Sequence, residues 1–411
     1  MDDATPRDEG SRGLLETPQT RRRFLTTAAL GALACSRSRV ATSRASGSMS
    51  ASPPGVWRLY VGTYTNEGAS RGIYALSLDR QSGELRDGGL VAETASPSFL
   101  AMAPNRRALY AVNELTEFGG QPSGAVTAFA RDPGTGALTS LGQRPSRGGA
   151  PCYISVDRAG RYVLVANYVG GNVALLPIDS TGALGDATAV VQHAGRGPNA
   201  DRQASPHAHC IILDAPNRFA IAADLGADAL MLYRVDDRRG LMTPADVAAF
   251  KLRAGAGPRH LAWASNAPTL YVVNELDSTL VVLSYDPYRG RLSEREIVST
   301  RPPGATGANF PADLHVHPRG HTVYASNRGD DTIAVFAVAP DTGRLALAQT
   351  VSTGGTWPRN FALDPTGTQL LVANQRSNSV VGFRIDEATG RLTPSGARVD
   401  LPAPVCLLFT D

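Results

Sequence analysis

The sequence predicts an all-β protein, a seven-bladed β-propeller whose C-terminal strand completes the first blade. Two observations carry this prediction: a unit of about fifty residues recurs along the chain, and short apolar stretches alternate with turns. The composition agrees, because 42 glycines and 28 prolines in 411 residues suit frequent turns. We found no helical periodicity in the repeats.

The repeating unit begins at a proline and places an asparagine sixteen residues later, at the end of its second apolar stretch. Five copies agree without a gap: Pro97 and Asn113, Pro151 and Asn167, Pro258 and Asn274, Pro311 and Asn327, and Pro358 and Asn374. A sixth copy carries Ala208 in the proline place and Asp224 in the asparagine place. A fixed register of this kind indicates a repeat architecture.

Each unit is expected to form three or four short strands. In one copy, residues 99–103 and 108–112 flank a Pro-Asn-Arg turn, and residues 126–129 precede an Asp-Pro-Gly turn. β-Branched and aromatic residues dominate these stretches, as they do in strands. Because so small a sheet cannot bury both faces alone, it must stack on its neighbours, as propeller blades do.

The ends of the repeat region predict how the ring closes. Residues 58–63 align with a second strand and residues 72–79 with a third, but no proline-led first strand precedes them. That strand recurs at residues 404–409, after which no second strand follows. Seven first and seven second strands then balance. We expect the last segment to complete the first blade, which removes exposed sheet edges.

The first fifty residues differ from the rest, and we expect two parts: residues 1–50 as a twin-arginine export signal and linker, and residues 51–411 as the propeller. Residues 20–25 read Thr-Arg-Arg-Arg-Phe-Leu, the twin-arginine pattern, and the apolar stretch at 24–35 is too short to span a bilayer. The protein is therefore expected to meet the twin-arginine translocase and to become periplasmic or envelope-associated. Cys35 is a candidate lipid anchor.

Charge and cysteine content exclude several classes of protein. The formal net charge of +3 is spread along the chain, so neither nucleic acid nor an anionic membrane surface is an expected partner. The cysteines show no paired spacing, so we expect buried thiols rather than a disulfide framework; they are Cys35, Cys152, Cys210 and Cys406. We expect no metal or other cofactor, no transmembrane span, and a monomer.

Polar residues recur at two positions that share one face of the disc. In an antiparallel hairpin the start of one strand lies beside the end of the next, so the residue after each proline lies near the residue after each asparagine. The first position holds Ser98, Cys152, His209, Arg259, Ala312 and Arg359, and the second holds Tyr64, Glu114, Tyr168, Leu225, Glu275, Arg328 and Gln375. Arginines, a histidine and glutamates thus converge at one mouth of the axial channel, which suits an anionic ester.

Several segments resemble the lactonase family of propellers, which includes 6-phosphogluconolactonases and the carboxy-muconate lactonising enzyme. They are residues 60–65 with 72–74, 110–114, 205–209, 257–260, 326–329 and 357–359. The resemblance covers residues 58–409 and implies a seven-bladed propeller that hydrolyses a sugar-type lactone without a metal. It also implies a catalytic site made of His209, Arg259, Glu275 and Arg328, which the repeat places at one mouth.

The resemblance leads to a working hypothesis. Arg259 and Arg328 hold the substrate anion or the ring carbonyl, so that the oxyanion develops against fixed positive charge. Glu275 is the general base and His209 protonates the leaving oxygen, or the two exchange roles, since a carboxylate between arginines is a weaker base than a neutral imidazole. The expected substrate-binding residues are Arg359, Glu114 and His207.

Two other functions stay open. An exported propeller without catalysis would bind a sugar acid or a protein partner at the same mouth. A redox propeller would need a haem or quinone site, but no Cys-x-x-Cys-His motif is present. His260, His315 and His317 fall at other strand phases, and we expect them to be structural.

Overall fold

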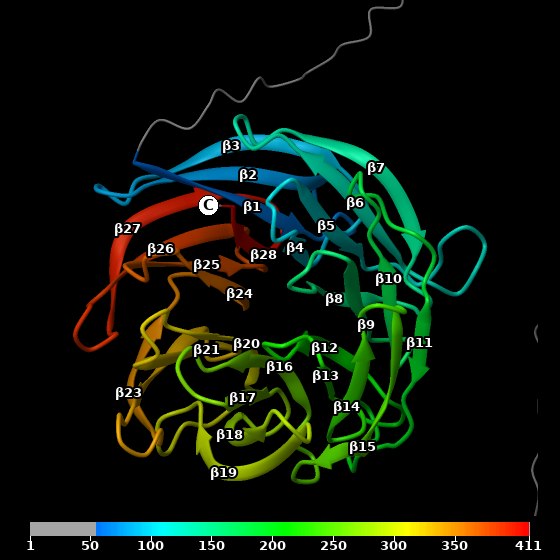
Figure 1. Ribbon diagram of the computed structural model, residues 1–411. Helices are drawn as coiled ribbons and strands as arrows, with labels where there is room; N and C mark the ends of the chain where they lie inside the picture. The colour runs from blue at the N-terminus through cyan, green and yellow to red at the C-terminus, as the bar shows by residue number, and fades with distance from the viewer. Residues whose placement is uncertain (1–54, 411) are drawn as a thin grey trace, which may run out of the picture. The chain divides into compact units, whose positions relative to one another are not determined.

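The computed structural model describes residues 55–410, which form seven four-stranded antiparallel sheets arranged as blades around an axis (Figure 1). The strands are β1 (Val56–Thr63), β2 (Gly72–Asp79), β3 (Leu85–Glu93), β4 (Leu100–Met102), β5 (Ala108–Asn113), β6 (Ala125–Arg131), β7 (Leu138–Pro145), β8 (Pro151–Val156), β9 (Tyr162–Asn167), β10 (Asn172–Pro177), β11 (Ala189–Gln192), β12 (Ala208–Leu213), β13 (Phe219–Asp224), β14 (Ala229–Asp236), β15 (Leu241–Lys251), β16 (Pro258–Trp263), β17 (Thr269–Asn274), β18 (Thr279–Asp286), β19 (Arg291–Ser299), β20 (Phe310–Val316), β21 (Thr322–Arg328), β22 (Thr332–Val338), β23 (Leu345–Ser352), β24 (Pro358–Leu363), β25 (Gln369–Asn374), β26 (Ser379–Ile385), β27 (Leu392–Asp400) and β28 (Pro404–Phe409). This range holds no helix, and so none that could cross a membrane.

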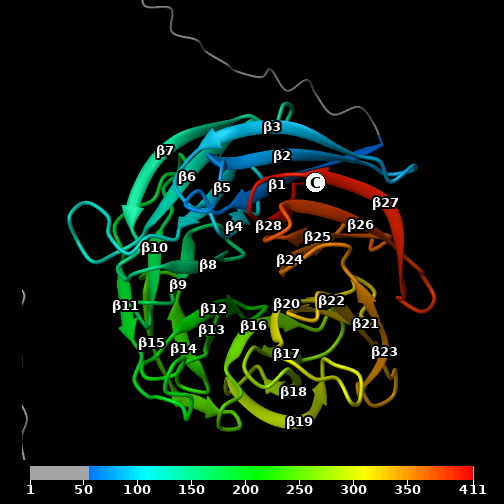
Figure 2. The ribbon, with the colours of Figure 1, turned by 180° about the vertical axis from the view of Figure 1, so that it is seen from behind.

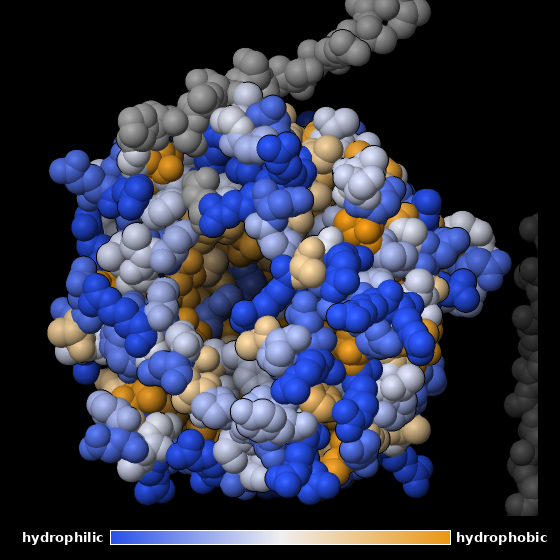
Figure 3. All heavy atoms as spheres, in the orientation of Figure 1, coloured by the Kyte–Doolittle hydropathy of each residue, from blue (hydrophilic) through white to orange (hydrophobic). Residues whose placement is uncertain are grey.

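Every blade uses the same strand order, from the axis outward. The first blade is β28-β1-β2-β3, and the others are β4–β7, β8–β11, β12–β15, β16–β19, β20–β23 and β24–β27. The inner strands contact one another around the axis and lie nearest the centre in both views (Figures 1 and 2). The space-filling view shows a hollow at the centre of one face (Figure 3). The predicted all-β, seven-bladed propeller is confirmed.

The ring closes as the sequence predicts. Strand β28 pairs antiparallel with β1, with Tyr60 opposite Leu408 and Val61 opposite Leu407. The N–H of Tyr64 also donates to the carbonyl of Ala403, at 3.1 Å. The C-terminal segment is thus the inner strand of the first blade, and it completes a sheet that would otherwise leave two edges unpaired.

The hydrophobic core consists of separate clusters between neighbouring blades. Seven clusters occupy the seven interfaces of the described ring. Between the fourth and fifth blades, for example, Phe219 and Leu230 pack with Leu261 and Leu270. Each blade therefore depends on its neighbours for burial, which is the energetic basis of a closed repeat.

The recurring asparagine has a structural reason. Its buried side chain fixes the end of the second strand to the loop that enters the blade: Asn167 Nδ2 donates to the carbonyl of Ser146 at 2.9 Å, and Asn327 Nδ2 donates to the carbonyl of Thr300 at 3.0 Å. Asp224 replaces it in the fourth blade and accepts from backbone N–H groups instead. The residue after each asparagine is thereby held at one face of the disc.

The structure differs from the expectation in detail. The inner strand of the second blade is β4, shorter than the predicted 99–103, and before it the carbonyl of Ser96 accepts from the N–H groups of Ser98 and Glu114. Each blade has four strands. The expected export signal at residues 1–50, with its twin arginines and Cys35, lies outside the described residues.

Candidate functional site

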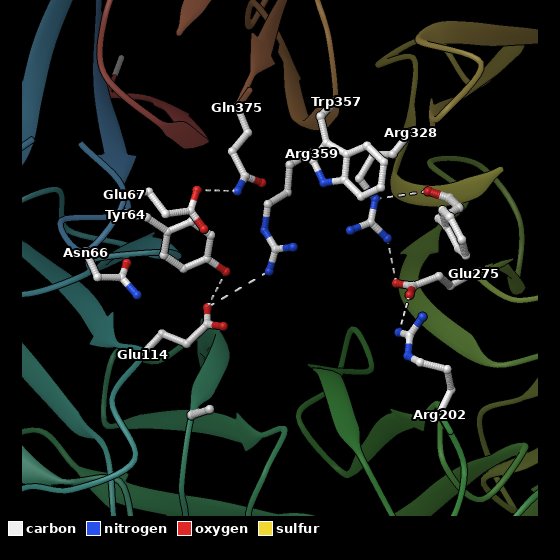
Figure 4. Close-up of a pocket in the computed structure, with 12 residues that line it drawn as sticks. Tyr64, Asn66, Glu67, Glu114, Arg202, Glu275, Arg328, Trp357, Arg359 and Gln375 are labelled. Atoms are coloured by element: carbon white, nitrogen blue, oxygen red, sulfur yellow. Dashed lines mark hydrogen bonds and ion pairs between the residues drawn. The ribbon is translucent and has the colours of Figure 1, made fainter. Parts of the chain in front are cut away.

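A cavity of about 460 Å³ lies where the second strands end and the inner strands begin (Figure 4). Six of its lining residues occupy the repeat positions singled out in the sequence: Tyr64, Glu114, Glu275, Arg328, Gln375 and Arg359. Others come from loops: Asn66, Glu67, Arg202 and Trp357. The repeat thus places charged groups from different blades around one cavity.

In most blades the residue after the proline position lies in a β-bulge. In the fifth blade, Pro258 pairs with Asn274 and His260 with Val273, so that Arg259 has no partner in the ladder. The same shift skips Cys152, His209 and Arg359 in their blades. A bulge re-aims a side chain. These bulges explain how successive inner-strand residues reach the axis.

Glu275 lies at the centre of the charged cluster. Its Oε2 accepts from Arg328 Nη2 at 2.6 Å and from Arg259 Nε at 3.0 Å. Its Oε1 accepts from Arg202, and Figure 4 shows the contacts with Arg328 and Arg202. Burial raises the pKa of this carboxyl, but the charges of the three arginines outweigh burial and lower the pKa to about 2. Glu275 is therefore an ionised anchor at neutral pH.

Arg259 and Arg328 differ in their access to the cavity. Arg328 lines it, whereas Arg259 is 1% exposed and lies behind Glu275. Arg259 also donates to the carbonyl of Ala312. Burial, with the nearby charges of Arg259 and Arg359, lowers the pKa of Arg328 to about 9, although Glu275 opposes that shift. Arg328 remains a cation at neutral pH.

Arg359 belongs to a second group on the opposite wall. Its guanidinium lies 5.2 Å from the centroid of the Tyr64 ring and 4.0 Å from Glu114 Oε2, which accepts from the Tyr64 hydroxyl at 2.9 Å (Figure 4). Burial opposes the charge of Arg359, but the interactions with Tyr64 and with the Glu114 carboxylate raise its pKa overall. Within residues 55–410 its guanidinium donates no hydrogen bond. Arg359 thus has unused donors at the cavity.

His209 is buried and does not line the cavity. Its ring lies beside those of Tyr168 and His260, with centroids 5.6 and 5.3 Å away. Burial, and then the charge of Arg259, lower the pKa of His209 well below its usual value, so the imidazole is neutral. Among the described residues, its Nδ1 has no hydrogen-bond partner. This nitrogen is thus a buried polar atom that no described group satisfies.

At two residues the structure differs from what the sequence predicted: His207 was expected to bind substrate, and Arg202 was not expected at the site. His207 stacks on Tyr168 at 4.5 Å, its Nδ1 lies 2.9 Å from the Tyr168 carbonyl, and it does not line the cavity. Arg202, which contacts Glu275 and donates to the Tyr168 hydroxyl at 3.4 Å, was missed. It lies in the loop between β11 and β12, outside the repeat, so no periodic signal marks it.

Residues 55–410 form neither the strand-to-helix nucleophile turn of a serine hydrolase nor a metal-binding cluster. Residues 68–72 match the Gly-x-Ser-x-Gly spacing of serine hydrolases, but Ser70 is buried against Thr63 and the segment leads into strand β2, not a helix. Residues 55–410 contain no group of three or more side chains that could hold a metal ion. Their cysteines are buried and free; they are Cys152, Cys210 and Cys406.

Fold and cavity together define a class of protein: a seven-bladed β-propeller with arginines and carboxylates around an axial pocket. A family model described as lactonase, 7-bladed beta-propeller, matches residues 58–409. The chain belongs to this family, as its motifs predicted.

Individual relatives agree with this assignment. A 6-phosphogluconolactonase of Bacillus subtilis is 37% identical over 293 residues, which cover 71% of this chain and 81% of the relative. A 6-phosphogluconolactonase of Formosa agariphila is 32% identical over 295 residues, 70% of this chain and 81% of the relative. Among solved structures, the periplasmic gluconolactonase PpgL of Pseudomonas aeruginosa has a TM-score of 0.80 and 33% identity, over 86% of this chain and 99% of that one.

Proposed function

We propose that this lactonase hydrolyses a sugar-type lactone in the axial cavity, using Arg328 and Arg359 to stabilise the oxyanion and His209 to activate water. The observation that carries the proposal is the meeting of arginines from different blades around one cavity beside a buried, neutral histidine. Relatives named 6-phosphogluconolactonase and gluconolactonase support the reaction class.

The charge balance of the site suits a reaction that creates a negative charge. Four arginines and three glutamates make up the cavity and its immediate support: Arg202, Arg259, Arg328, Arg359, Glu67, Glu114 and Glu275. Four positive and three negative charges leave an excess of one positive charge. An oxyanion at the lactone carbonyl would neutralise this excess, so the site would stabilise the transition state more than a neutral ground state.

His209 is a better candidate base than Glu275. A carboxyl with a pKa of about 2, held by three arginines, has little tendency to take a proton from water at neutral pH. His209 is neutral, and its Nδ1 has no partner among the described residues. We therefore assign Glu275 to the positioning of Arg328 and Arg202, and the base to His209.

The proposed steps balance in atoms and charge. Water attacks the carbonyl carbon and gives a proton to His209, and the oxyanion forms against Arg328 and Arg359. Collapse of the tetrahedral intermediate breaks the ring carbon–oxygen bond, and the imidazolium of His209 returns its proton to the leaving oxygen. The product is an open hydroxy acid. Glu114 and Tyr64 offer hydrogen-bonding groups for sugar hydroxyls.

The same proposal includes export. Residues 20–25 carry the twin-arginine pattern, and the gluconolactonase PpgL is described as periplasmic. Residues 1–50 are then the export signal and linker, the twin-arginine translocase is the transport partner, and the mature propeller acts in the periplasm or at the cell envelope. Cys35 is the candidate anchor.

A lactone panel tests the proposed function. Protein comprising residues 51–411 is mixed with neutral and phosphorylated aldonolactones, and acid release is followed in a pH-stat. We expect at least one lactone to be consumed well above its spontaneous rate. Consumption of every lactone at the spontaneous rate, by protein that melts cooperatively, would overturn the proposal.

A further inference from the structure

Beneath the charged cluster lies a second tier of inner-strand residues, one position further along each strand. The second tier consists of Phe99, Tyr153, Cys210, His260, Asp313, Asn360 and Cys406. In three neighbouring blades it carries polar side chains that are almost completely buried, namely His260, Asp313 and Asn360. Buried polar groups are costly unless they are paired, so their partners indicate their role.

Asp313 is surrounded by donors. Its Oδ1 lies 2.7 Å from His260 Nδ1 and accepts from the N–H of Leu314 at 2.9 Å. Its Oδ2 accepts from Asn360 Nδ2 at 2.6 Å and lies 3.1 Å from His315 Nε2. Because every neighbour is a donor, Asp313 acts as an ionised acceptor.

Asn360 has only one possible orientation. Its Oδ1 accepts from the N–H of Leu407, at 2.6 Å in strand β28, so its Nδ2 must face Asp313. Because Asn360 must donate to residue 313, an asparagine at that position could not accept from both Asn360 and His260. An asparagine at 313 would have to turn its oxygen toward Asn360 and its amino group toward His260.

The contact with Asp313 decides the tautomer of His260. Nδ1 must carry the proton that Asp313 accepts, so Nε2 keeps a lone pair in a neutral ring. That lone pair faces Arg259 Nη1 at 3.3 Å. Burial, together with the charge of Arg259, lowers the pKa of His260 to about 4, and the ring stays neutral at physiological pH.

Arg259 connects this tier with the charged cluster. Its Nε donates to Glu275 Oε2 at 3.0 Å, and Glu275 in turn holds Arg328 at 2.6 Å. Arg259 is buried and does not line the cavity. Its side-chain conformation can therefore affect the cavity only through the orientation of Glu275.

We propose that Asp313 and His260 are positioning residues, which fix Arg259, and through it Glu275 and Arg328, in the geometry that hydrolysis requires. Asp313 selects the tautomer, His260 accepts from Arg259, and Arg259 orients Glu275. This role rests on the proposed function for its effect on turnover, whereas the tautomer itself is independent of it.

Three variants test the kinetic part. His260→Leu removes the acceptor and should lower kcat at least tenfold, with KM changed less than threefold. Gln can donate to Asp313 and accept from Arg259, so His260→Gln should recover most of the lost kcat. Asp313→Asn should lower kcat as His260→Leu does. In that variant His260 would turn a protonated Nε2 toward Arg259, which can only donate.

A matched control separates positioning from packing. His193 and Asp224 form a similar buried pair at 2.6 Å, and neither of them is a hydrogen-bond partner of Arg259. His193→Leu should lower Tm and leave kcat and its pH profile unchanged. If His260→Leu and His193→Leu have the same kcat where both are folded, or if His260→Gln is no better than His260→Leu, the positioning role is wrong.

The tautomer gives a readout that needs no turnover. Long-range ¹⁵N–¹H spectra of protein labelled at its seven histidines should show His260 with a protonated Nδ1, and with a protonated Nε2 in Asp313→Asn. A protonated Nε2 in the unmodified protein would refute the proposal even if it hydrolyses lactones. The expected tautomer, in a protein that hydrolyses no lactone, would contradict the proposed function and leave the structural role of Asp313 supported.

Discussion

Replacement of Glu275 by glutamine should destabilise the protein as well as slow it. The substitution keeps the shape of the side chain but leaves three arginines without their shared carboxylate: Arg202, Arg259 and Arg328. Removing one partner of a buried ion pair costs about 3–5 kcal/mol, because the remaining charge stays buried. The buried cluster therefore predicts a loss of stability as well as a loss of turnover.

The pKa of Glu275 gives a second measure of the same effect. A fall from 4.5 to about 2 corresponds to about 3 kcal/mol at roughly 1.4 kcal/mol for each unit. Because the folded-state pKa is depressed, this stability is present above about pH 4.5 and is lost as the pH falls toward 2. Both routes predict a loss of about 3 kcal/mol at neutral pH.

Thermal and urea unfolding measure this loss directly. At roughly 2 °C per kcal/mol, the lower end for large domains, Glu275→Gln should melt about 6 °C below the parent at pH 7, and the difference should shrink below pH 4. Glu67→Gln is the matched control, since Glu67 is an exposed carboxylate of the same cavity that accepts from Gln375 at 2.7 Å. A Glu275→Gln variant that melts with the Glu67→Gln control would refute the anchoring role.

Three further predictions concern the ring, the anion site and export. Deleting residues 404–411 removes β28 and should abolish most of the stability; an unchanged Tm would contradict ring closure. Arg359→Ala should raise KM more for anionic than for neutral lactones, because unused guanidinium donors are removed; equal changes would argue against an anion contact. Replacing Arg21 and Arg22 by lysine should leave folded precursor in the cytoplasm, as fractionation will show, and undiminished export would exclude the twin-arginine route.

The fold could be predicted because the residues that repeat along the chain each have a local structural role. Asn167 and Asn327 fix loop carbonyls, which explains why five copies carry the same amide at the same place. The missing first strand at the beginning and the unpaired one at the end then determine the closure. The exact ends of β4 could not be predicted, because they depend on which residues pair with β5 and not on residue type alone.

The site was only partly predictable, for physical reasons. The interval placed Glu275 and Arg328 at one mouth, and the structure brings them into contact at 2.6 Å. It could not show that a bulge at Arg259 turns that side chain behind Glu275. Arg202 carries no repeat signal because its loop, residues 193–207, is longer than the equivalent loops of the other blades.

His260 shows a different limit of sequence analysis. Its strand phase led us to expect a structural residue, since alternate residues of a regular strand face opposite sides. The bulge before it removes that alternation, so that His260 contacts both Arg259 and Asp313. Sequence periodicity predicts side-chain direction only in a regular strand. It does not predict where a β-bulge changes that direction.

The turnover number of His209→Asn on the best lactone tests the central claim most directly. Asparagine is similar in polarity but cannot accept a proton from water, so kcat should fall about a hundredfold or more. The Tm should stay within a few degrees of the parent, because Nδ1 of His209 makes no hydrogen bond to the described residues. A kcat equal to that of the parent would contradict the assignment of His209 as the base, and with it the mechanism proposed for the axial cavity.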